Sequence, residues 1–149
     1  MNLNNFTIKA QEAVAAAQQI AFKQKNQQIE TAHLLKAMID DENKSIEFLL
    51  KKNDANLAFI GQKLQELLTK IPTTSGEGGQ VISREVNQTV LKAGSYLKDF
   101  GDEFITPEHL LMAMLNNNDA VSHLLKDAGL SEKNLKKSIA YPEKVFSIF

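Results

Sequence analysis

Three histidines and the absence of cysteine limit the chemistry open to this 149-residue chain. Without cysteine, disulfides and thiolate metal sites are excluded, and a cytoplasmic location is expected. His33 and His109 occupy equivalent places in two similar segments, and His123 is the third histidine. A zinc site would need carboxylates as further ligands, and no spacing such as HExxH provides one. We therefore expect His33 and His109 to be partly buried and to close the start of a helix each.

Two short motifs resemble known sites but lack the partners that their chemistry needs. Residues 99–101 spell Asp-Phe-Gly, as in protein kinases, without the Gly-rich loop, strand lysine or catalytic loop of a kinase. We expect instead a helix that ends at Phe100, followed by Gly101 in a left-handed conformation. The acidic run 40–42 lacks the alternating ligands and central glycine of a calcium loop. No GxSxG nucleophile is present, so we expect a non-enzymatic chain with no cofactor and no metal.

The composition is that of an ordinary globular protein. Hydrophobic residues make up 43% and charged residues 23% of the chain, with 17 Lys+Arg against 18 Asp+Glu. A net charge near zero gives no sign of the basic face that would bind nucleic acid or an anionic membrane surface. No apolar run approaches the roughly 20 residues of a membrane span, and the first ten residues lack the basic start and apolar stretch typical of a signal peptide. We expect a soluble monomer.

An internal repeat organises the chain. Residues 29–40, IETAHLLKAMID, align with residues 105–116, ITPEHLLMAMLN, with six identities in twelve positions. The offset of 76 slips by one further along, where LLK at 49–51 matches LLK at 124–126. A tandem duplication explains this pattern, and repeats of this length are supersecondary units that share one core.

Within each repeat the apolar residues recur at helical spacing, and no alternating stretch predicts a strand. The fold class is therefore all-α, with eight helices as two pseudo-symmetric sets of four. The predicted helices cover residues 7–24, 31–40, 45–53, 56–71, 83–100, 106–116, 119–128 and 131–140.

Several residues predict where these helices begin and end. Asn56, Thr106 and Ser131 can accept a hydrogen bond from a first-turn amide. Pro107 suits the first helical position because no amide is needed there, and Gly129 can end the preceding helix.

We expect one domain over residues 1–141, made of repeats at about 4–71 and 82–140. A Gly-rich loop, residues 72–81, joins them. It is not expected to bind phosphate, because no Lys-Ser or Lys-Thr follows it and no strand pattern precedes it. Residues 142–149 form an atypical tail, apolar after Pro142.

Three features recur in a known family: FTIKAQEAVAAAQ at residues 6–18, the helix starts HLLKAM at 33–38 and HLLMAM at 109–114, and the Gly-rich joint. Over about residues 3–140 the chain resembles the N-terminal domain of Clp-type AAA+ chaperones, and ClpB-type disaggregases most of all. It implies a substrate-binding domain that works with the ATPase modules of a ClpB-like protein, modules that these 149 residues do not include. Such a domain captures exposed apolar segments of unfolded or aggregated polypeptides in a shallow groove.

The resemblance also assigns residues to that groove. Three polar positions beside it map onto Thr7, Asp102 and Glu108, and its apolar wall maps onto a helix from which Val90 and Tyr96 face it. The substrate-binding residues implied are Thr7, Val90, Tyr96, Asp102, Glu108 and His109.

Lys92 and His109 stand where some relatives have leucine, which implies a more polar groove. We expect Lys92 to lay its methylenes along apolar surface and to keep its ammonium in water. Each polar position also has a structural explanation. Thr7 suits a helix N-cap, Glu108 complements a helix dipole, and Asp102 follows a helix-ending glycine.

Three alternatives remain open. The chain could be a free-standing adaptor or decoy that competes with a full-length unfoldase. It could be a ClpC-type module that binds adaptors or phosphoarginine, although Ala32 replaces the glutamate that those relatives carry in the first repeat. A small hydrolase would require a deep pocket with a perturbed acid or histidine.

Overall fold

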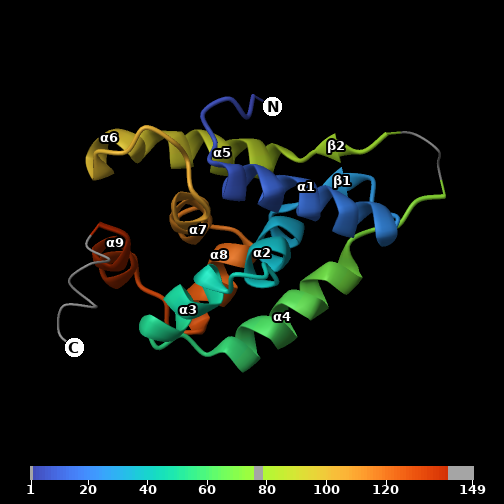
Figure 1. The fold of residues 1–149 in the computed structure, drawn as a ribbon. Coiled ribbons are helices and arrows are strands. Elements are labelled where there is room, and N and C mark those ends of the chain that lie inside the picture. Colours follow the sequence, from blue (N-terminus) through green and yellow to red (C-terminus); the bar gives the residue numbers. More distant parts are fainter. Residues whose placement is uncertain (1, 76–78, 141–149) are drawn as a thin grey trace.

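The computed structural model of this chain describes residues 2–75 and 79–140, and they are mainly helical (Figure 1). The predicted tail 142–149 lies outside the described residues, as does the centre of the loop 72–81. In chain order the elements are α1 Ile8–Lys23, β1 Gln28–Ile29, α2 Thr31–Ile39, α3 Ser45–Lys52, α4 Leu57–Lys70, β2 Val81–Ile82, α5 Arg84–Ser95, α6 Leu97–Phe100, α7 Pro107–Leu115, α8 Ala120–Asp127 and α9 Glu132–Ala140. All eight predicted helices are present.

The fifth predicted helix is interrupted at Tyr96, so that its last turn forms the separate helix α6. The amide of Tyr96 bonds to the carbonyl of Ala93, three residues back, at 3.1 Å. A turn tightened in this way interrupts the regular four-residue ladder. Sequence periodicity continues through the break because the apolar spacing of the two helices is the same.

Two short strands were not predicted, and they show how the repeats interlock. β1 and β2 pair in parallel, with Ile29 opposite Ile82. A parallel bridge also joins Phe6 to Ile105. Each residue of the second pair lies 76 positions from its counterpart in the first, so the segment before each repeat's first helix pairs with the other repeat. Strands of two residues are too short to produce a detectable alternation.

The centre of the fold is α7. Every residue from His109 to Leu115 is buried, and the helix contacts α5, α8, α9, α1 and α2. Figure 1 shows α7 with α5 above it, α8 below it and α9 to its left. One cluster of buried apolar side chains spans both repeats, from Phe6 to Leu135. The amphipathic helices surround a helix that is apolar on all sides, as burial requires.

The predicted helix ends are confirmed. Asn56 accepts from the amide of Phe59 at 3.1 Å, and Thr106 accepts from that of His109. Ser131 does the same at the start of α9. Gly129 has a φ of 106° and Gly101 a φ of 70°, the left-handed region that glycine adopts without strain.

Within the described ranges, no helix combines the length and apolarity needed to cross a membrane.

Candidate functional site

A cavity of about 280 Å³ lies where α3, α7 and α9 meet. Asp102, Glu108 and His109, three of the six predicted binding residues, line it. The loop before α7 carries Asp102, and the first turn of α7 carries the other two. The remaining lining residues are Ser45, Phe48, Leu49, Lys52, Thr106, Ser138 and Ile139. We call this cavity the α3–α7–α9 pocket.

His109 is the structural base of the pocket. Its side chain is only 1% exposed, and its Nδ1 accepts from the amide of Thr106 at 3.0 Å. An amide can only donate, so the neutral ring carries its proton on Nε2. That nitrogen donates to Oδ2 of Asp102 at 2.9 Å, while the ring of Phe100 lies 5.4 Å away between centroids. The predicted role in closing the helix start is confirmed, but His109 is fully buried, not partly.

Two carboxylates are accessible from the pocket, which Lys52 also lines. The side chain of Asp102 is 45% exposed, although one of its oxygens is held by His109. Glu108 is partly buried in the first turn of α7, where a negative charge complements the helix dipole. The carboxylate oxygens of Asp102 and Glu108 can accept hydrogen bonds from a ligand that packs on the apolar side chains of Leu49 and Ile139.

The first repeat contains the same histidine motif in a closed form. His33, also fully buried, accepts from the amide of Glu30 at 2.9 Å and contacts Oδ1 of Asn26 at 2.8 Å. Asn26 corresponds to Asp102 at the offset of 76. Its amide nitrogen reaches the carbonyls of Ile71 and Pro72, so the start of the inter-repeat loop covers it. The open carboxylate therefore exists in the second repeat alone.

The buried histidine of the first repeat predicts a pH dependence of stability. Burial lowers the pKa of His33 below its ordinary value of 6.5, so the unfolded chain binds the proton more readily. The stabilisation is complete above pH 6.5 and is lost as the pH falls toward the folded-state pKa. We expect the free energy of unfolding to fall by up to about 1.4 kcal/mol per pH unit in that window.

Urea unfolding of the protein and of His33→Gln between pH 7.5 and 5 checks this expectation. The variant should be less stable at pH 7.5 but should show a flatter pH dependence below 6.5. Glu30 acts in the opposite direction, because burial and then the charge of Glu85 raise its pKa above 4.5, and it is present in both proteins. Equal slopes for the two proteins would contradict the assignment to His33.

The other predicted residues lie outside the α3–α7–α9 pocket. Thr7 caps α1 by accepting from the amide of Ala10 at 3.1 Å, and its own amide bonds to the carbonyl of Ile105. Val90 is partly buried against the core. The hydroxyl of Tyr96 accepts from Asn116, at the opposite end of α7 from His109. The structure does not bring these three side chains together with Asp102 and Glu108 in one cavity.

Lys92 is partly buried, and its ammonium is hydrogen-bonded to the protein itself. Its Nζ donates to the carbonyl of Asn116 at 2.7 Å and lies 3.3 Å from Oδ1 of Asn117. The ammonium thus binds the C-terminal end of α7, where a cation complements the helix dipole.

Sequence reasoning missed the α3 and α9 walls of the pocket. Phe48 is 49% exposed and lies under the ammonium of Lys52, 4.7 Å from its ring centroid. Asn53, which ends α3, donates to Oγ of Ser138 at 3.2 Å and so joins α3 to α9. One sequence signal could have indicated the α3 wall. Phe48 does not lie on the face of α3 that Ile46 and Leu50 bury in the core.

Fold and pocket together define a mainly helical domain of two interlocked repeats with an open, partly apolar pocket between its helices. The chain belongs to the Clp repeat (R) N-terminal domain family, which matches residues 5–128. The ClpB chaperone of Bacteroides thetaiotaomicron is 39% identical over 139 residues, and that of Porphyromonas gingivalis is 37% identical. Each alignment covers 93% of this chain and 16% of the relative, so the chain spans about one sixth of their length.

Solved structures share the fold. The N-terminal domain of Hsp104 from Candida albicans superposes with a TM-score of 0.77 at 24% identity, covering 93% of this chain and 90% of that one. A ClpV N-domain solved in complex with a VipB peptide has a TM-score of 0.77 at 14% identity and covers 94% and 90%.

Proposed function

We propose that this domain captures exposed apolar segments of unfolded or aggregated polypeptides, as the non-enzymatic substrate-binding part of a ClpB-like chaperone. The observation that carries the proposal is the α3–α7–α9 pocket, which combines apolar walls with two carboxylates. The peptide bound to a ClpV N-domain supports a peptide ligand for this fold. The similarity to ClpB chaperones supports a role in the cytoplasm beside ATPase modules, with unfolded protein as the substrate.

The pocket suits weak and sequence-tolerant binding. Apolar burial has no preferred direction and yields about 25 cal/mol per Å² before the cost of ordering the ligand. The carboxylates of Asp102 and Glu108 can accept from backbone amides or from lysine and arginine near an apolar ligand residue. A small pocket of about 280 Å³ holds one or two side chains, so the ligand can be released again. Buried His109 positions Asp102, and Thr7, Val90 and Tyr96 remain predictions as contacts.

An NMR titration of the isotope-labelled protein with a permanently unfolded, carboxymethylated protein tests this proposal. Shifts should cluster at Asp102, Glu108 and Ile139, and the folded form of the same ligand should cause none. The variant Asp102→Asn with Glu108→Gln keeps the side-chain shapes and removes both charges. We expect it to bind about fivefold more weakly, which is about 1 kcal/mol.

The matched control is Asp99→Asn with Glu103→Gln. These two acids are exposed, lie close in sequence and do not line the pocket, so their removal changes the net charge equally. If both double variants weaken binding to the same extent, the protein's overall charge is responsible and the pocket assignment fails. Shifts at the residues of α1 alone would also overturn it.

A further inference from the structure

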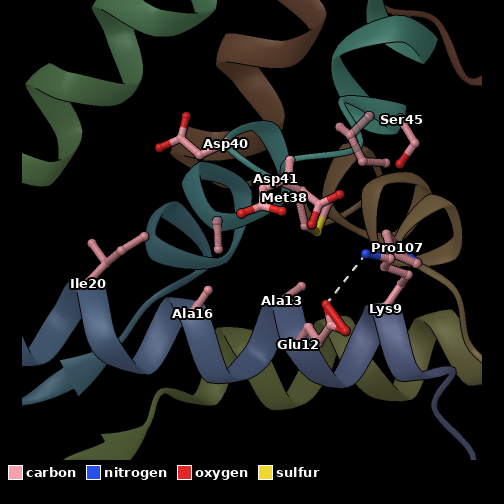
Figure 2. A pocket seen from close by; sticks show the side chains of 13 residues that line it. Lys9, Glu12, Ala13, Ala16, Ile20, Met38, Asp40, Asp41, Ser45 and Pro107 are labelled. Atoms are coloured by element: carbon pink, nitrogen blue, oxygen red, sulfur yellow. Dashed lines mark ion pairs between the residues drawn. The ribbon is translucent and has the colours of Figure 1, made fainter.

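A second cavity, of about 500 Å³, lies between α1 and the end of α2 (Figure 2). Side chains of Ala13, Ala16 and Ile20 on α1 point into it, and Met38 faces them from α2. Asp41, just beyond the end of α2, lies above this apolar floor. We call this cavity the α1–α2 groove.

The repeat provides an internal comparison for this groove. At the offset of 76, α1 corresponds to α5, and the end of α2 corresponds to the end of α7. The packing is preserved, since α1 contacts α2 as α5 contacts α7. The equivalent positions are Ala13 and Thr89, Ala16 and Lys92, Ile20 and Tyr96, Asp40 and Asn116, and Asp41 and Asn117.

In the second repeat, the chain's own side chains fill this space. Lys92 donates to the carbonyl of Asn116 at the end of α7. Asn117 donates to the hydroxyl of Thr89 at 2.6 Å, and the side chain of Asn116 donates to Tyr96 at 2.9 Å. The negative end of α7 is therefore neutralised by a lysine that reaches across from α5.

In the first repeat, the same space is open and more negative. Alanines replace the threonine and the lysine, so α1 extends neither a hydroxyl nor an ammonium from these positions toward α2. Carboxylates at Asp40 and Asp41 replace the two asparagines, and Glu42 adds a third along the same edge. The end of α2 thus combines the negative helix terminus with acidic side chains.

Nearby cations only partly offset this charge. Lys9 lies 3.5 Å from Glu12, across the groove from the end of α2. Lys36 pairs with Asp40 at 2.7 Å. Asp41 accepts from the amide of Asn43, a neutral partner. The groove is lined by four carboxylates and one ammonium, those of Glu12, Asp40, Asp41, Glu42 and Lys9.

We propose that the α1–α2 groove receives a lysine- or arginine-bearing segment of a partner polypeptide, whose cation takes the place at the end of α2 that Lys92 takes at the end of α7. The apolar side chains beside that cation pack on Ala13, Ala16 and Ile20. A polypeptide satisfies both parts of the groove, because a small cation alone would leave the apolar floor exposed to water. This site adjoins the α3–α7–α9 pocket at Ser45, which lines both cavities, but it does not depend on the proposed role of that pocket.

A titration followed by NMR tests the proposal with the whole chain. The probe is a capped eight-residue peptide, SKLFKSGG, compared with the same peptide carrying glutamine or glutamate in place of both lysines. We expect the lysine peptide to shift the amides of Ala13, Ala16, Met38 and Asp41. The glutamine peptide should bind at least about fivefold more weakly, and the lysine peptide should weaken as salt is added.

Two lysine substitutions on α1 provide a matched pair. Ala16→Lys supplies the chain's own cation at the position equivalent to Lys92 and should weaken peptide binding about tenfold. Ala15→Lys adds the same charge at an exposed neighbour that does not line the groove, and should change binding less than about twofold. The double variant Asp41→Asn with Glu42→Gln should weaken binding severalfold and reduce its salt dependence.

Four outcomes of the peptide titrations would overturn the proposal. These are equal binding of the lysine and glutamine peptides, equal effects of Ala16→Lys and Ala15→Lys, shifts confined to Asp102 and Glu108, or no binding. Spermine is the control for a free polyamine. If spermine shifts the same amides as strongly as the peptide, the groove binds cations in general and the polypeptide partner is refuted. Failure at the α3–α7–α9 pocket alone leaves these results unaffected, because the two sites are read from different amides.

Discussion

Replacing Leu111 with alanine is expected to lower the free energy of unfolding by about 3 kcal/mol, within the usual range of about 2–5 kcal/mol for a buried leucine. Leu111 is 0% exposed and lies in the middle of α7, which packs against elements of both repeats. Its truncation removes apolar contacts and leaves a cavity that rigid helices on several sides cannot close. For a domain of this size the melting temperature should fall by about 10 °C.

Urea and thermal unfolding, monitored by far-UV circular dichroism, measure this effect. Leu91→Ala is the matched control, since the same atoms are deleted from a leucine that is 76% exposed on α5. We expect its stability to stay within about 0.5 kcal/mol of the original chain. A loss of less than 1 kcal/mol at Leu111 would show that α7 is not the centre of the fold.

The second large effect is expected for Asn26→Asp, a change of one atom type in a side chain of the same shape. Asn26 is 2% exposed, and its amide nitrogen faces the carbonyls of Ile71 and Pro72 at 3.4 and 3.3 Å. In the aspartate, one oxygen would still face Nε2 of His33, but the other would point negative charge at two carbonyl acceptors. Burying an uncompensated charge costs several kcal/mol, so we expect a loss of about 3 kcal/mol at pH 7.

The reciprocal change Asp102→Asn is the control provided by the repeat. Asp102 occupies the equivalent position but is half exposed, and an asparagine oxygen can still accept from His109. Its stability should change by less than about 1 kcal/mol. The deficit of Asn26→Asp should shrink as the pH falls toward 4, because burial raises the pKa of the new carboxyl above its ordinary value and the protonated form can donate to one carbonyl. A deficit that is independent of pH, or equal losses for the two variants, would contradict the buried-charge explanation.

Helix positions and helix ends could be predicted because they depend on neighbours within one turn. Asn56, Thr106 and Ser131 accept the first-turn amides that their residue types indicate, and Gly129 has the left-handed φ that its place predicts. The break at Tyr96 could not be predicted in the same way. The apolar spacing on both sides of it is continuous, and the tightened turn leaves no mark in the periodicity.

The candidate site was predicted only in part. Asp102, Glu108 and His109 lie within a few residues of one another, so the sequence was enough to predict that they belong to one site. The walls from Phe48 and Ile139 come from α3 and α9, and no local pattern connects segments so far apart in sequence. For the same reason, the distance between Tyr96 and this pocket became clear only in three dimensions.

The amino-acid sequence by itself determined the duplication, the helical class, the capping residues and the resemblance to Clp N-terminal domains, because each follows from residue type and short-range spacing. Only the tertiary structure decided what the duplicated positions do. Asn26 is covered by the inter-repeat loop while Asp102 faces solvent, and Lys92 closes a space that Ala16 leaves open. The two repeats share one backbone plan, and the packing of segments distant in sequence determines which of their equivalent sites is accessible to a ligand.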